Sequence, residues 1–149
     1  MKTSRLRELQ ITYTPHRSGA LVAPDRALRT PQDAAAICVP MLKDQTQEIM
    51  VALLVDAKHR VIGSFEIARG GLSSVVVDPK VVFRAALAAS AHGLILAHNH
   101  PSGDPTPSPD DFALTARLQA AGKLLEIEIL DHLVIGDTGY CSFKETGRL

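Results

Sequence analysis

The chain has 149 residues, of which 46% are hydrophobic and 21% are charged, so it is long enough to fold as one domain around a hydrophobic core. Sixteen basic and sixteen acidic residues give a formal net charge of zero, which argues against strong nonspecific attraction to nucleic acid. Two separated cysteines form no disulfide framework, the N-terminus has no secretory signal and no apolar run is long enough for a membrane span, so we expect a cytoplasmic protein.

The first part of the chain is expected to contain a peripheral arm and one helix. Residues 1–29 include prolines and a glycine without sustained periodicity, so we expect an N-terminal arm there and a domain over residues 30–149. Thr30 is suited to cap a helix, with Pro31 at its first position. We expect Pro40 to bend or end this helix.

The central part of the chain predicts strands and then a second helix. The apolar runs at residues 49–55 and 61–68 flank a turn and predict a hairpin. A short strand is expected at residues 73–77, and a helix over residues 79–91 should follow Asp78.

The last part of the chain alternates the same elements. Residues 94–98 predict a buried strand, and residues 99–109 contain four prolines and one glycine, which predicts a loop. A helix should then run to about residue 121, closed by Gly122. Residues 124–135 and 140–143 predict further strands. Interleaved strands and helices indicate an α/β or α+β protein with a mixed sheet flanked by helices.

The loop segment holds the residues that point to chemistry. His98 and His100 are two residues apart at a strand end, so their side chains should point the same way, roughly 6–7 Å apart, and could converge on one metal ion. Asp111 lies in the first turn of the next helix. Two histidines and one carboxylate leave a fourth tetrahedral position for water, which is typical of a catalytic zinc ion rather than a structural one.

Each of these residues also has a simpler explanation. A His-x-His pair can be a surface feature, and Ser108 can cap the helix in a capping box with Asp111. Asp110 can interact favourably with the helix dipole. The combination of paired histidines, a proline-rich turn and a serine and aspartate at a helix start favours the metal site.

The arrangement His98-x-His100-x7-Ser108-x2-Asp111 is similar to the signature of the JAB/MPN (JAMM) metalloproteases. The fuller string HNHPSGDPTPS, together with LDHLVIGD at residues 130–137, resembles the RadC family of bacterial proteins. This resemblance covers roughly residues 30–149.

The resemblance implies a JAB/MPN-like fold of cytidine deaminase-like architecture, with Zn²⁺ held by His98, His100 and Asp111. It also implies hydrolysis of an amide bond in a protein or peptide substrate, with Ser108 stabilising the oxyanion and an upstream glutamate acting through the zinc-bound water as general base. Glu48 matches the place of that glutamate, ahead of an apolar strand. Glu66, on the next strand, is the rival assignment.

Two departures from the RadC pattern bear on function. Asp78-Pro79-Lys80 stands where the family usually has His-Pro-Arg, and we expect a short form that lacks the helix-hairpin-helix region of longer members. The chain is similar to the short form found beside mobile elements. His132 also matches the family; we expect a packed or hydrogen-bonded core histidine, with contact to a metal ligand as the alternative.

Other functions are weaker matches. The adjacent letters His-Asn-His do not form the spread motif of an HNH nuclease, and the cysteine pattern does not fit a zinc deaminase. A two-histidine, one-carboxylate iron oxygenase would leave the glutamate and serine unexplained. The main alternative is an accessory protein for DNA repair or recombination, with weak nucleic-acid binding and a structural or regulatory metal. The sequence does not predict the oligomeric state.

Overall fold

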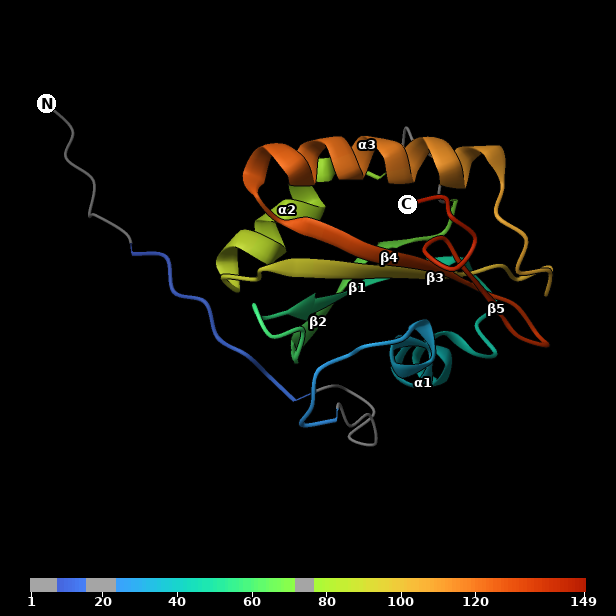
Figure 1. The fold of residues 1–149 in the computed structure, drawn as a ribbon, viewed down its shortest axis with the longest axis horizontal. Helices are drawn as coiled ribbons and strands as arrows, with labels where there is room; N and C mark the ends of the chain where they lie inside the picture. Colours follow the sequence, from blue (N-terminus) through green and yellow to red (C-terminus); the bar gives the residue numbers. More distant parts are fainter. Residues whose placement is uncertain (1–7, 16–23, 72–76) are drawn as a thin grey trace, which may run out of the picture.

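A five-stranded mixed sheet is the centre of the fold, in the computed structural model that describes residues 8–15, 24–71 and 77–149 (Figure 1). The strands are β1 (Ile49–Val55), β2 (Val61–Arg69), β3 (Gly93–Asn99), β4 (Glu128–Ile135) and β5 (Tyr140–Ser142). They lie in the order β2-β1-β3-β4-β5, and only the β3–β4 pair is parallel. The predicted class, a mixed sheet flanked by helices, is confirmed.

Among the described residues, three helices cover the two faces of this sheet. Figure 1 shows α1 (Pro31–Leu42) on one face and α2 (Pro79–Ala88) with α3 (Pro109–Leu125) on the other. Every residue of β1 and β3 is buried, because these strands are covered on both faces. That is why they are continuous apolar runs rather than alternating polar and apolar positions. Each face has its own hydrophobic core.

The first helix begins as predicted but continues past its proline. Thr30 and Asp33 form a capping box at the start of α1. Pro40 lies within the helix, which runs on to Leu42. Pro40 therefore does not end the helix, contrary to the prediction. Cys38 and Leu42 are buried in the core beneath α1, and this packing holds the last helical turn although proline has no N–H to donate.

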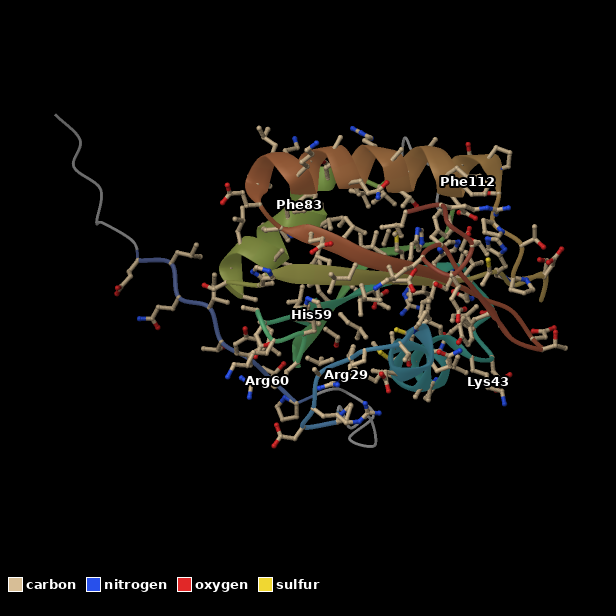
Figure 2. The ribbon with its side chains drawn as sticks, in the orientation of Figure 1. Arg29, Lys43, His59, Arg60, Phe83 and Phe112 are labelled. Carbon is tan, nitrogen blue, oxygen red and sulfur yellow. The ribbon has the colours of Figure 1, made fainter. Side chains whose placement is uncertain are left out.

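The third helix also runs past its expected end. Gly122 lies inside α3, and the left-handed cap is Glu126, with φ of 57°. A Cβ atom on Gly122 would lie 2.4 Å from the Ile127 carbonyl oxygen and 3.3 Å from the ring of Phe83, which α2 presents to α3 (Figure 2). Gly122 is therefore needed for close packing and not for a positive φ. Because α3 continues to Leu125, the strand predicted from residue 124 starts only at Glu128.

The remaining elements follow the predictions closely. The hairpin of β1 and β2 is confirmed, and Asp78 caps α2, which ends at Ala88 rather than at residue 91. The short strand expected at residues 73–77 falls almost wholly outside the described residues. Residues 8–15 form no helix or strand. No helix in the described part of the chain is long and apolar enough to cross a membrane.

Candidate metal centre

The two histidines of the motif lie at the carboxyl end of the central strand β3. His98 is buried in the strand, and His100 is the first residue after it. The His100 N–H donates to the Ile135 carbonyl oxygen at 2.9 Å, which continues the pairing with β4 one residue beyond β3. The extended backbone therefore reaches His100, and the two side chains point the same way as predicted.

The loop after His100 is held against the turn between β4 and β5. The Asp137 N–H donates to the Gly103 carbonyl oxygen at 2.9 Å. A Cβ atom on Gly136 would lie 2.4 Å from that same oxygen, so only glycine allows the approach. Within the loop, His100 Nδ1 lies 2.8 Å from the Asp104 carbonyl oxygen. A carbonyl only accepts, so Nδ1 carries the proton and Nε2 of neutral His100 has a free lone pair.

The start of α3 orients Asp111. The Ser108 N–H donates to Asp111 Oδ2 at 2.7 Å, and the Asp111 N–H donates to Ser108 Oγ at 3.1 Å. This reciprocal pair is a capping box, so the predicted helix-capping role of Ser108 and Asp111 is confirmed. The same geometry leaves Asp111 Oδ1 beside His98, while Oδ2, which accepts from Ser108, also faces His100. Phe112, the next residue, marks this turn of the helix in Figure 2.

Three side chains converge closely. His98 Nε2 lies 3.1 Å from Asp111 Oδ1 and 3.1 Å from His100 Nε2, and His100 Nε2 lies 3.2 Å from Asp111 Oδ2. Atoms bound to one zinc ion at about 2.1 Å in tetrahedral geometry are roughly 3.4 Å apart. The nitrogen and carboxylate donors therefore have a chemistry and spacing that a tetrahedral divalent metal ion could use.

Glu48 completes a group of four, whose possible ligand atoms all lie within 4.8 Å of one another. Its Oε1 is 3.9 Å from Nε2 of each histidine, and 24% of its side chain is exposed. The backbone on both sides of Glu48 is fixed by Asn99, whose Oδ1 accepts from the Ile49 N–H at 2.7 Å and whose Nδ2 donates to the Gln47 carbonyl oxygen at 2.9 Å. Glu48 therefore lies beside the three closer ligands, where solvent can still reach it.

Glu66, the rival to Glu48, lies elsewhere. It forms an ion pair with Arg69 on β2, at 2.8 Å, and it is not part of the group of four found among the described residues. The structure brings Glu48, not Glu66, to the histidines.

Electrostatics favour an ionised Asp111. Burial alone would raise its pKa, but hydrogen bonds and charge interactions with His98 and Ser108 outweigh burial and hold the pKa below the usual range for aspartate. Burial also holds the pKa of His132 well below the ordinary histidine value, so that ring is neutral. An ionised carboxylate beside two imidazoles is a donor set that suits a divalent metal ion.

Three further residues support the site, and only His132 was singled out from the sequence. His132 is fully buried and lies 2.8 Å from His98 Nδ1, so it is a hydrogen-bonded core histidine that also contacts a predicted ligand. Thr115 and Asn99 were missed. Thr115 follows Asp111 by one helical turn, a spacing that places it on the same helix face, and Asn99 stands between the two histidines, but their partners depend on distant parts of the chain.

A family model described as a RadC-like JAB domain matches residues 28–148. The chain belongs to the RadC family. Among curated RadC relatives, a UPF0758 protein of Clostridium perfringens is 47% identical over 115 residues, which cover 77% of this chain and 51% of that protein. A UPF0758 protein of Methanosarcina acetivorans is 40% identical over 124 residues, 83% of this chain and 54% of that protein. The matched part is thus about half the length of these relatives, and their names indicate no activity.

Proposed function

We propose that this RadC domain is a zinc-dependent hydrolase that cleaves a peptide, isopeptide or related amide bond. The convergence of His98, His100 and Asp111 carries the proposal. Their nitrogen and oxygen atoms lie 3.1–3.2 Å apart, close enough to bind one cation together. Imidazole and carboxylate ligands suit zinc.

The chemistry then divides between the metal and the chain. Bound zinc supplies the Lewis acidity that polarises an amide carbonyl and brings the pKa of water to about 7. Hydrolysis also needs a base to take the proton of the attacking water and to return it to the leaving nitrogen. Glu48 is the proposed group for both transfers; its carboxylate lies 3.9 Å from each histidine Nε2 and remains partly exposed, which supports this role.

Ser108 is the second catalytic group in this proposal. Its Oγ accepts the Asp111 N–H, so the hydroxyl proton is left to be donated to another partner. A hydroxyl beside the ligand carboxylate can stabilise the negative charge that develops on the carbonyl oxygen. The capping role and the catalytic role therefore use different atoms of the same group and do not conflict.

Metal content is the first test. Protein expressed with ample zinc should contain about one zinc ion per chain, and His98→Ala or Asp111→Ala should lose it, whereas Glu66→Gln should keep it. Metal at 100 times its dissociation constant stabilises the fold by about 2.7 kcal/mol. That corresponds to a rise in melting temperature of roughly 5–11 °C for a domain of this size. Elemental analysis that finds no metal in the wild-type protein would refute the zinc site.

Activity is the second test, on a panel of tagged proteins and peptides with and without a chelator. Glu48→Gln should keep the zinc content and fold but reduce cleavage by about 10²–10⁴-fold, the usual contribution of general acid–base catalysis. Glu66→Gln, as the matched control, should have little effect. Cleavage that survives the chelator, or normal cleavage by Glu48→Gln, would contradict the mechanism.

A further inference from the structure

A buried chain of hydrogen bonds connects one predicted metal ligand to the main chain of another. His98 Nδ1 lies 2.8 Å from His132 Nε2, and His132 Nδ1 lies 2.6 Å from Thr115 Oγ1. Thr115 Oγ1 in turn lies 2.7 Å from the carbonyl oxygen of Asp111. All four residues are at least 97% buried, so bulk water does not compete for the hydrogen bonds between them.

The carbonyl at the end fixes the direction of every bond in the chain. A carbonyl oxygen only accepts, so the Thr115 hydroxyl must donate its single proton to Asp111. Thr115 Oγ1 is then the acceptor from His132, and the His132 ring carries its proton on Nδ1. His132 Nε2 has a free lone pair and accepts from His98 Nδ1–H. Reversing any of these hydrogen bonds would leave a buried donor or acceptor without a partner, which costs about 1–3 kcal/mol of stability.

We propose that His132 and Thr115 are positioning residues that hold His98 in the tautomer with its proton on Nδ1. This tautomer leaves His98 Nε2 bare and directed at Asp111 Oδ1, 3.1 Å away. The opposite tautomer would place a proton where the metal must bind. The role in metal binding rests on the zinc site proposed above, but the choice of tautomer does not.

Packing against a neighbouring aromatic ring holds the His132 side chain in place. His132 stacks on Phe143, with ring centroids 4.8 Å apart and an interplanar angle of 27°, and Phe143 is fully buried. Hydrogen-bonding partners of metal-bound histidines usually fix ring orientation and tautomer, and their loss typically reduces metal affinity 10- to 100-fold. Carboxylates and carbonyls are the usual partners; here a neutral histidine takes that place.

The inference is tested first in metal-free protein labelled with ¹⁵N-histidine, at pH 8. Long-range ¹H–¹⁵N correlations report which ring nitrogen carries the proton. Wild-type His98 should show the proton on Nδ1, and His132→Phe should lose this preference because the ring acceptor is gone. A wild-type His98 with its proton on Nε2 would overturn the inference, and this result would stand whether or not the protein binds zinc.

Zinc affinity, measured by competition with a chelating indicator, is the second reading. His132→Phe should bind zinc 10- to 100-fold more weakly, and His132→Gln, whose Oε1 can accept near the place of Nε2, should restore most of the affinity. If His132→Phe does not fold, Thr115→Val and Thr115→Ser decide: the nearly isosteric valine removes the hydroxyl and should weaken binding, whereas serine keeps it. Equal affinity for valine, serine and wild type would overturn the inference.

Discussion

The contact between the motif loop and the β4–β5 turn can be broken by a single methyl group. A Cβ atom on Gly136 would lie 2.4 Å from the Gly103 carbonyl oxygen and 2.7 Å from Pro105 Cδ. Both distances are below any real Cβ contact, and the neighbours are backbone and a rigid ring. Gly136→Ala must therefore move the loop away from the turn.

The size of the effect follows from the packing. Forcing one extra carbon into a tightly packed place typically destabilises a protein by about 1–3 kcal/mol. For a domain of this size, each kcal/mol lowers the melting temperature by roughly 2–4 °C, so we expect a fall of about 2–12 °C. The same loop supplies the Asp104 carbonyl that holds His100 Nδ1. Zinc affinity should therefore fall by at least about tenfold, although no predicted ligand is changed.

Gly139→Ala is the matched control, because Gly139 lies in the same turn and a Cβ atom there meets nothing within 4 Å. Its effect on stability should stay within about 0.5 kcal/mol. Denaturant unfolding of the metal-free proteins measures the stability difference, and competition with a chelating indicator measures zinc affinity. If Gly136→Ala matches Gly139→Ala in both measurements, the loop is not held by this contact and the reasoning fails.

Three further predictions address other parts of the chain. The Arg26 guanidinium is the main cause that holds the pKa of Asp33 below the ordinary aspartate value, so the stabilising effect of Asp33 is complete above that ordinary value and is lost as the pH falls toward the folded pKa. The difference in melting temperature between wild type and Asp33→Asn should therefore shrink from pH 5 to pH 2, and a constant difference would contradict this. Asn99→Ala leaves the Ile49 N–H and the Gln47 carbonyl without their partner and should destabilise the protein by about 1–3 kcal/mol for each group that stays buried, as measured by denaturant unfolding. DNA binding should be weak and strongly dependent on salt, because the net charge is zero; tight, sequence-selective binding at physiological salt would instead support the accessory-protein alternative.

The sequence predicted those features that depend on neighbouring residues. The apolar runs of β1 and β3 and the Ser108–Asp111 cap are local patterns, and each lies where it was expected. Helix ends were missed where distant packing decides: Pro40 is tolerated because α1 is held on the sheet, and Gly122 faces Phe83, 39 positions away in the chain.

The candidate site divides in the same way. The spacing of His98, His100 and Asp111 predicted that these residues form one site, since they lie close in sequence. Asn99 acts on residues about 50 positions earlier, and His132 lies 34 positions after its partner His98. Such contacts depend on which strands become neighbours in the sheet, and nothing in the local pattern encodes them.

The alternation of side chains along β3 separates the site into two halves. His98 pairs across the sheet with Met50 and belongs to the layer under α3, whereas Asn99 points to the layer under α1 and fixes the backbone around Glu48. Substitutions under α1 can therefore displace Glu48, the proposed base, while the three proposed metal ligands stay in place. If the proposed function holds, changes on one side of one strand could remove hydrolysis and leave metal binding intact, so that an enzyme would become a metal-stabilised binding module.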